Sequence, residues 1–354
     1  MAIVSLNIEN ISHRWMEGRG PEAEIVISSR VRLARNFQGY PFPYLATDQQ
    51  AVEIMELVSG ILPVGEGEFA LFKVADLDSL DRQVLVEKHL ISPLLVKEAR
   101  SSAVLLREEE GISIMVNEED HLRIQCLFSG LQLDKAWDTA NKYDNLLEKH
   151  TNYAFHEDWG YLTSCPTNVG TGLRASVMVH LPALVLSKQI NRILSAISQV
   201  GLAVRGFYGE GTEVAGNLIQ ISNQITLGQS EGEILQNLYG VTRQIIEQEQ
   251  KARQKLLNEK RDQLGDRAGR ALGILTHARL MSSEEAMGLL SDLRLGTDLR
   301  LIENPPGYQA LNELLVLTRP ASLQKATGKK LSSGDRDAVR ARLLRERLKM
   351  KKEE

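Results

Sequence analysis

The stretch Ser164-Cys165-Pro166-Thr167-Asn168-Val169-Gly170-Thr171-Gly172-Leu173-Arg174-Ala175-Ser176-Val177-Met178-Val179-His180-Leu181-Pro182 decides the fold prediction. Its first half is a loop with a thiol beside a proline, and its second half alternates like a strand with one buried face. Gly170 and Gly172 allow the backbone to approach a ligand closely. Arg174 stands where the loop becomes the strand. The stretch therefore predicts an anion site at a strand end, although Gly-Thr-Gly also makes ordinary turns.

Composition sets the class of protein. The chain has 354 residues and a formal net charge of −4, which demands neither a nucleic acid nor a membrane surface as partner. No apolar run is long enough to span a bilayer, and the first residues lack the pattern of a secretory signal. Two cysteines, Cys126 and Cys165, form no disulfide framework and have no zinc spacing. We expect a cytoplasmic protein with two modest domains or one large one.

The order of elements predicts an α+β body followed by a helical tail. Strand patterns cover residues 25–27, 69–74, 103–106, 112–116, 177–181, 202–207 and 217–227, and helix patterns cover 47–59, 78–89, 133–150, 187–200 and 231–261. Residues 262–320 are rich in leucine and in capping signals, which indicates several short helices. We expect a lead-in over 1–24, a catalytic domain over 25–261 and a helical C-terminal domain over 262–354.

Arginines recur at strand ends and loops throughout the body. Arg30 and Arg32 are two residues apart, so on an extended segment they point to the same side. The other three are Arg123, Arg174 and Arg205. Any one of these arginines is most simply a solvated surface charge. Five arginines in one pocket, however, would repel one another unless a polyanion filled it, and a nucleoside triphosphate suits their bidentate donors.

The chain carries neither a GxxxxGK[ST] loop nor the motifs of ordinary protein kinases. Four segments instead resemble, in order, the catalytic domain of phosphagen (guanidino) kinases: Ser28-Ser29-Arg30-Val31-Arg32, Asn117-Glu118-Glu119-Asp120-His121-Leu122-Arg123, the Cys165 loop with Gly170 to Ser176, and Arg205-Gly206 with Gly209-Glu210. The resemblance covers roughly residues 20–260. It implies a central antiparallel sheet flanked by helices, with ATP and Mg²⁺ as cofactors.

The resemblance also implies roles for individual residues. The ATP-binding residues that it implies are Ser28, Ser29, Arg30, Val31, Arg32, His89, Arg123, Arg174, Ala175, Ser176, Val177, Met178, Arg205, Gly206, Phe207, Tyr208 and Gly209. It gives the catalytic roles to Glu119, Glu210 and Cys165, with no metal ligand from the protein because Mg²⁺ arrives on ATP. Two carboxylates can orient an acceptor guanidinium and take its proton, and Cys165 beside them is expected to act as a thiolate. From the residues alone, His89 could be a capping histidine and Cys165 a small buried side chain.

The chain departs from the kinases of free guanidino metabolites. Its Ser-Ser-Arg-Val-Arg segment begins at residue 28, where those enzymes have a helical N-terminal domain first, and a helical C-terminal region follows instead. This combination resembles the bacterial protein-arginine kinases. That resemblance implies protein substrates (unfolded proteins and a heat-shock repressor), a stress-response role with a Clp ATPase/protease, an activator protein and a homodimer.

In the C-terminal tail, Arg336-Asp337-Ala338-Val339-Arg340-Ala341 matches the phosphoarginine-binding motif of those enzymes. The resemblance makes Arg336, Asp337, Arg340 and Ala341 an allosteric site, while from the residues alone a surface Arg–Asp pair on a helix is favoured. Two other functions stay open at this point. One is a kinase of a free guanidino metabolite, and the other is a non-catalytic adaptor on the same fold.

Overall fold

A computed structural model describes residues 13–65, 68–97, 101–206 and 215–349. Its centre is a sheet of eight strands, every paired neighbour antiparallel, in the order β2-β3-β4-β5-β1-β8-β10-β9. The strands are β1 Val26–Arg35, β2 Ala70–Lys73, β3 Ala103–Arg107, β4 Ile112–Val116, β5 Leu122–Ser129, β8 Leu173–His180, β9 Leu202–Gly206 and β10 Leu218–Asn223. A separate hairpin joins β6 Phe155–His156 to β7 Gly160–Tyr161.

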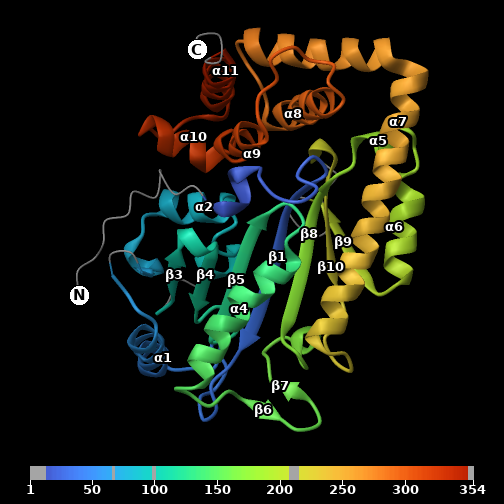
Figure 1. The fold of residues 1–354 in the computed structure, drawn as a ribbon. Helices are drawn as coiled ribbons and strands as arrows, with labels where there is room; N and C mark the ends of the chain where they lie inside the picture. The colour runs from blue at the N-terminus through green and yellow to red at the C-terminus, as the bar shows by residue number, and fades with distance from the viewer. Residues whose placement is uncertain (1–12, 66–67, 98–100, 207–214, 350–354) are drawn as a thin grey trace.

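Helices surround this sheet (Figure 1). They are α1 Asp48–Ile61, α2 Ser79–Glu87, α3 Pro93–Lys97, α4 Leu133–Glu148, α5 Pro182–Leu186, α6 Ile190–Gln199, α7 Glu231–His277, α8 Ser283–Asp298, α9 Tyr308–Leu317, α10 Pro320–Thr327 and α11 Ser333–Lys349. Short 3₁₀ turns include η2 Arg14–Glu17 and η5 Pro166–Asn168. The predicted fold class is confirmed, because an antiparallel sheet flanked by helices precedes a helical C-terminal region.

Alternation along the central strands creates two unlike faces. On β1, Val31 and Leu33 are fully buried against the main core, which also contains Ile124 of β5 and Val177 of β8. Arg30 and Arg32 alternate with Val31 and Leu33 along β1. Their side chains lie on the other face because successive side chains point to opposite sides of a strand. The core face is packed with helices, and the polar face is left for the site.

The long helix α7 extends beyond its predicted end. Ser230 caps its N-terminus in a capping box with Glu233, as the sequence signal indicates. The helix then runs for 47 residues to His277, with non-helical dihedral angles at Lys260. The predicted end at residue 261 thus corresponds to a break within the helix, after which the chain continues as the first helix of the C-terminal region.

Residues 13–24 belong to the folded body. The Trp15 side chain is 1% exposed, and its Nε1 donates to the Lys88 carbonyl at 3.2 Å. Ala23 accepts a hydrogen bond from Arg294 of α8 at 2.6 Å. The described part of the predicted lead-in therefore lies between the sheet and the C-terminal helices.

The C-terminal helices rest on the end of the sheet, next to α2 (Figure 1). Both carboxylate oxygens of Glu87, the last residue of α2, accept the amides of Ala321 and Ser322 at 2.8 Å, in the first turn of α10. Lys325 of α10 pairs with Asp81 of α2 at 2.6 Å. Because a carboxylate at a helix N-terminus satisfies otherwise unpaired amides, α2 and α10 are fixed relative to each other.

One buried ion pair connects β1 to α4. The guanidinium of Arg35 donates to both oxygens of Asp144, with distances of 2.7 to 3.1 Å, and also to the carbonyls of Ala34 and Thr171 at 2.9 Å. The Tyr161 ring stacks on this guanidinium, 3.5 Å from its central carbon. This arrangement satisfies a charge that would otherwise be costly to bury.

We predict that Asp144→Ala lowers the free energy of unfolding by about 3–5 kcal/mol, because it leaves the buried Arg35 guanidinium without its counterion. Urea unfolding followed by circular dichroism measures this loss. The matched control is Lys142→Ala, which removes an exposed ion pair with Glu110 and should cost less than about 1 kcal/mol. A loss for Asp144→Ala no larger than for the control would contradict the prediction.

Candidate active site

A cleft of about 210 Å³ lies on the polar face of the sheet. The charged and thiol side chains that line it are Arg32, Glu119, Arg123, Cys165, Arg174 and Arg205, together with Thr167, Asn168 and Gly172 of the loop before β8. Residues from β1, β5, β8, β9 and two loops therefore meet at one place. Of the five arginines predicted to share one pocket, Arg32, Arg123, Arg174 and Arg205 line this cleft beside an acid and a thiol, whereas Arg30 lines a neighbouring hollow.

Strand register places the arginines. Arg32 of β1 is directly opposite Arg174 of β8, and Arg123 of β5 is opposite Ala34, two residues further along β1. Opposed like charges on neighbouring strands are destabilising. The sheet therefore holds cations together that would separate in a flexible segment.

Electrostatic strain in this group is visible in its pKa values. Burial, followed by repulsion from Arg174, Arg123 and Arg205, lowers the pKa of Arg30 to about 10. Burial and repulsion from Arg30, Arg123 and Arg174 also lower the pKa of Arg32 well below its usual value. Within the described part of the chain, Nε of Arg32 is buried and has no hydrogen-bond partner. These features suit a polyanion, which would supply acceptors and counter-charge together.

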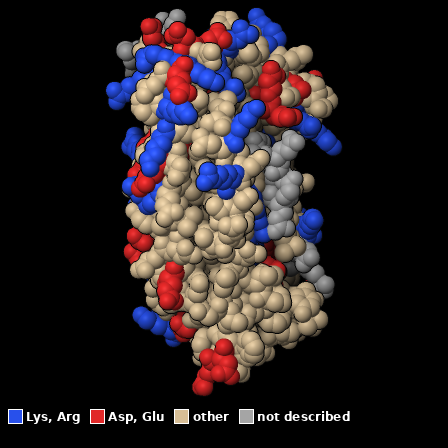
Figure 2. All heavy atoms as spheres, turned by 90° about the vertical axis from the view of Figure 1, so that its right-hand side faces the viewer, with Lys and Arg blue, Asp and Glu red and all other residues tan. Residues whose placement is uncertain are grey.

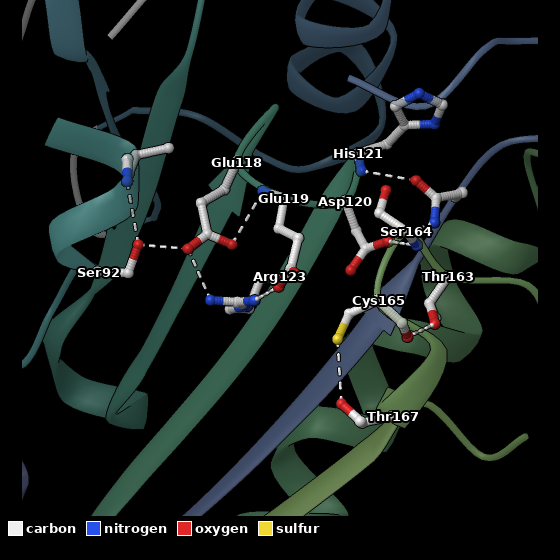
Figure 3. Close-up of polar contacts among 12 residues, drawn as sticks. Ser92, Glu118, Glu119, Asp120, His121, Arg123, Thr163, Ser164, Cys165 and Thr167 are labelled. Atoms are coloured by element: carbon white, nitrogen blue, oxygen red, sulfur yellow. Dashed lines mark hydrogen bonds and ion pairs between the residues drawn. The ribbon is translucent and has the colours of Figure 1, made fainter. Parts of the chain in front are cut away.

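Two adjacent glutamates orient Arg123 (Figure 3). Glu118 Oε1 accepts from Nη1 of Arg123 at 2.6 Å, and Glu119 Oε2 accepts from Nη2 at 2.8 Å. The Glu118 side chain is fully buried and also accepts from the Ser92 hydroxyl and from the Glu119 amide at 3.0 Å. Glu119 is 32% exposed and faces the cleft. Glu118 thus fixes both an arginine of the cleft and the backbone of the predicted catalytic carboxylate.

Cys165 lies on the opposite loop (Figure 3). Its Sγ is 3.0 Å from the Thr167 hydroxyl, and Cys165 occupies the N-cap position of the 3₁₀ turn η5 without a side-chain capping hydrogen bond. Buried Asp120 accepts from the Ser164 amide and from the Asn36 side chain, both at 2.7 Å. One turn, Glu118 to Asp120, therefore positions both sides of the cleft.

The loop needs its glycines for close backbone approach. Gly170 has a φ of +111°, and a Cβ there would be 2.2 Å from the Thr226 carbonyl oxygen. Gly172 has a φ of +63°, and a Cβ on this residue would be 2.6 Å from the Ala34 carbonyl oxygen. The sequence analysis expected these glycines to let the backbone approach a ligand. In the structure they let the loop approach the backbone of neighbouring segments, including Ala34 of β1.

A second hollow adjoins the arginines on the same face. It is lined by Trp15, Ile27, Ser28, Arg30, His89, Leu127, Ser176, Met178 and Gln220. Arg30 donates to the Gln220 side chain at 2.9 Å and to the Ser176 hydroxyl at 3.3 Å. His89 follows α2 with a φ of +59°, and burial lowers its pKa to about 3, so its ring is neutral at neutral pH. Apolar side chains of Trp15, Ile27, Leu127 and Met178 thus share this hollow with polar groups, as is common in ligand-binding pockets.

The predicted ATP-binding residues divide between the two faces of the sheet. Ser28, Ser176 and Met178 line the second hollow, but Ser29, Val31, Ala175 and Val177 have their side chains on the core face. Ser29, for example, donates to the Gly130 carbonyl at 2.8 Å. This division refines the prediction, which treated each run of residues as one unit. Gly206 ends β9, where it pairs with Ile219.

Four predicted residues lie outside the described residues: Phe207, Tyr208, Gly209 and Glu210. In the C-terminal motif, Arg336 and Asp337 are partly exposed on α11, whereas Arg340 and Ala341 are buried. The Arg340 guanidinium donates to Asp337 at 2.6 Å and to the carbonyls of Thr318 and Met281 at 2.7 Å. Much of its donor capacity thus holds the helical region together.

Sequence reasoning missed several residues of the site. Glu118 and Asp120 were quoted only as neighbours of Glu119, and Trp15 was included in a polar lead-in. The residue type was the signal available for Trp15, because tryptophan side chains are mostly buried in folded proteins. Gln220 gave no signal, since its place depends on the pairing of β10 with β8 and β9.

Comparisons with known proteins agree with this fold. The family model "ATP:guanido phosphotransferase, C-terminal catalytic domain" matches residues 51–252, and "Protein-arginine kinase McsB C-terminal domain" matches residues 261–354. A protein-arginine kinase of Brevibacillus brevis is 55% identical over 97% of both chains, and one of Pelotomaculum thermopropionicum is 53% identical over 96% of both. In fold, lombricine kinase matches with a TM-score of 0.58 at 24% identity, covering 69% of this chain and 70% of its own.

The antiparallel sheet, the cationic cleft on its open face and the matching catalytic-domain model together identify a guanidino kinase. The chain belongs to the ATP:guanido phosphotransferase family and, within it, to the protein-arginine kinases.

Among the described residues, no group of three or more His, Cys, Asp or Glu side chains is arranged to hold a metal ion. In the same part of the chain, every helix is too short or too polar to cross a bilayer.

We predict that Glu118→Gln lowers kcat/KM for ATP roughly 10- to 150-fold, because a hydrogen bond to a charged group contributes about 1.5–3 kcal/mol. Steady-state kinetics with a protein acceptor measure the effect. Glu109→Gln, at an exposed glutamate, is the matched control and should behave like the wild type. Equal kinetics for the two variants would show that Glu118 does not position Arg123 and Glu119.

Proposed function

We propose that this enzyme transfers the γ-phosphoryl group of ATP to arginine side chains of proteins, using the cleft between β1, β5, β8 and β9. The observation that carries the proposal is the convergence of Arg32, Arg123, Arg174 and Arg205 with Glu119 and Cys165 around one cavity. Relatives named protein-arginine kinase, at 51–55% identity over nearly the whole chain, support the choice of acceptor.

ATP would span both hollows of the polar face. Its base would lie among Trp15, His89 and Met178, and its phosphates would enter the cleft of arginines. Mg²⁺ would arrive bound to the phosphates and share their charge. Arginines that already lie in place stabilise charge on the moving phosphoryl group without reorganising during the reaction.

Glu119 would bind the acceptor guanidinium on the far side of the cleft. A guanidinium has a pKa above about 12 and is therefore a poor nucleophile until a carboxylate orients it and accepts a proton. As the N–P bond forms, the bond from the γ-phosphorus to its bridging oxygen breaks and ADP leaves. The proton passes to a carboxylate, for which we propose Glu119 or Glu210. Cys165, which lines the same cleft, would lie beside the guanidinium.

The family resemblance leads us to propose the cellular setting as well. Unfolded proteins and a heat-shock repressor would be substrates in a cytoplasmic stress response, and the phosphoarginine mark would direct proteins to a Clp ATPase/protease. An activator protein and a homodimer complete this proposal. A kinase of a free guanidino metabolite remains the second candidate, because such an enzyme would use the same kind of cleft; the match to lombricine kinase supports a shared fold alone.

Labelled ATP distinguishes these two candidates. We expect acid-labile label on an unfolded protein and none on free arginine, since the proposed acceptor is an arginine side chain within a polypeptide. Thin-layer chromatography of free arginine and acid treatment of the labelled protein provide the measurement. Label on free arginine alone would overturn the proposed acceptor.

We further predict that Glu119→Gln reduces phosphoryl transfer at least roughly 100-fold, the usual contribution of a general base. Binding of ATP, measured by calorimetry, should be retained because the phosphates contact the arginines. Loss of transfer and ATP binding together would contradict this division of roles.

The C-terminal motif supports a second proposed site, for phosphoarginine. Asp337 would contact the guanidino group and Arg336 the phosphoryl group, with Arg340 holding Asp337 from the buried side. Such a site lies on α11, in the helical region and apart from the residues that line the cleft.

We predict that Arg336→Ala weakens binding of free phosphoarginine by at least about tenfold, the effect of losing one charged hydrogen bond. Calorimetry on the full chain measures it, with Arg342→Ala as the control because Arg342 is an exposed arginine of the same helix. Unchanged binding in Arg336→Ala would remove Arg336 from the proposed site.

A further inference from the structure

The β6–β7 hairpin exposes two large aromatic side chains that the fold does not bury. Phe155 is 57% exposed and Trp159 is 54% exposed. Between them stand Glu157 and Asp158, also exposed, with the Asp158 side chain at 84%. Burying an aromatic side chain removes a large apolar area from water, so two of them left outside indicate a surface that a partner covers. We call residues 155–159 the hairpin tip.

The hairpin tip stands on a rigid base. Tyr161 N donates to the Gly170 carbonyl at 2.8 Å, and Leu162 N donates to the Ala154 carbonyl at the same distance. The Tyr161 ring lies on the buried Arg35 guanidinium. The Phe155 ring contacts the Tyr161 ring edge-on, with ring centroids 5.3 Å apart. The Phe155 ring is therefore held against the body of the enzyme, and the Trp159 amide donates to the His156 carbonyl within the hairpin at 3.2 Å.

This base is part of the acceptor side of the cleft. Gly170, which pairs with Tyr161, lies in the loop that carries Cys165 and Thr167, both of which line the cleft. From Tyr161 to Cys165 the chain advances only four residues. A polypeptide with its arginine in the cleft would thus have neighbouring residues within reach of the hairpin tip.

Charge indicates which polypeptide suits this surface. Any arginine-bearing acceptor approaches a cleft that already holds Arg32, Arg123, Arg174 and Arg205, which repel it. Glu157 and Asp158 place negative charge at the outer edge of the acceptor side. Acidic atoms are visible at the lower end of the molecule in Figure 2, where Figure 1 places β6 and β7.

We propose that the hairpin tip is a docking surface for unfolded, arginine-bearing polypeptides, whose apolar side chains contact Phe155 and Trp159. The aromatics select unfolded chains, because folded proteins bury most of their large apolar side chains. The acids select cationic segments. This inference rests on the proposed function, since it concerns how a protein substrate reaches the same cleft.

The test compares two forms of one substrate, native lysozyme and reduced, alkylated lysozyme, which share their arginines and differ in exposed apolar surface. In Phe155→Ser with Trp159→Ser, KM for the unfolded form should rise about five- to tenfold, as expected when aromatic contact residues are truncated. The value of kcat, the KM for native lysozyme and the affinity for ATP should stay unchanged. Leu280→Ser is the matched control, because Leu280 is 66% exposed and lies between α7 and α8, at the far end of the molecule in Figure 1.

The double variant Glu157→Gln with Asp158→Asn tests the contribution of the two acidic residues. Its KM for unfolded lysozyme should rise at low ionic strength, and the difference from the wild type should shrink as salt is added. A salt-independent effect would contradict the electrostatic part of the proposal.

Three outcomes would overturn the docking proposal. One is a KM for unfolded lysozyme that is the same in the aromatic variant and in Leu280→Ser. Another is an equal rise in KM for native and unfolded lysozyme, because the surface would then not select unfolded chains. The third is a change of sedimentation in the aromatic variant with KM unchanged, which would assign the surface to contact between copies of this chain. Absence of arginine phosphorylation in the wild type would instead contradict the proposed function.

Discussion

Repulsion among arginines is the constraint on which this structure depends. Arg32 and Arg174 face each other across β1 and β8, and neighbouring cations together with burial lower the pKa of Arg30 and Arg32. A flexible segment would let these charges separate, but a sheet buried on its opposite face cannot slip, because a shift of one residue would expose its core. Packing of the core face therefore stabilises the strand register, although that register places repelling arginines next to one another on the other face. The open face is in this way prepared for an anion.

Acidic residues of one turn connect the parts of the cleft. Glu118 bonds Arg123, Ser92 and the Glu119 amide, while Asp120 holds the Ser164 amide beside Cys165. Burial raises the pKa of Asp120, although its two hydrogen bonds act in the opposite direction. The turn thus relates the sheet that carries the arginines to the loop that carries the thiol. The positions of Glu119 and of the Cys165 loop therefore depend on buried contacts within the protein.

The helical region is joined to the same sheet by the end of α2. Glu87 accepts the amides at the start of α10, and two residues later His89 reaches the hollow that contains Trp15 and Arg30. The two ring centroids of Trp15 and His89 are 5.7 Å apart. The hollow beside the arginines and the C-terminal helices are therefore linked through a few residues of chain at the end of α2.

The sequence by itself determined the fold class, the arginines of the cleft, Glu119 and Cys165, because local alternation and ordered motifs carry that information. It placed the end of the long helix near residue 261, where the structure shows only an interruption within α7, which continues to His277. Only the tertiary structure decided which face each residue of a motif occupies, so that Arg30 lies in the site and Val31 in the core. It alone brought in Trp15, Gln220 and Asn36, and showed that Arg340 is buried against Thr318 and Met281. The reason is that these contacts join residues distant in the chain, and strand pairing and helix packing set them.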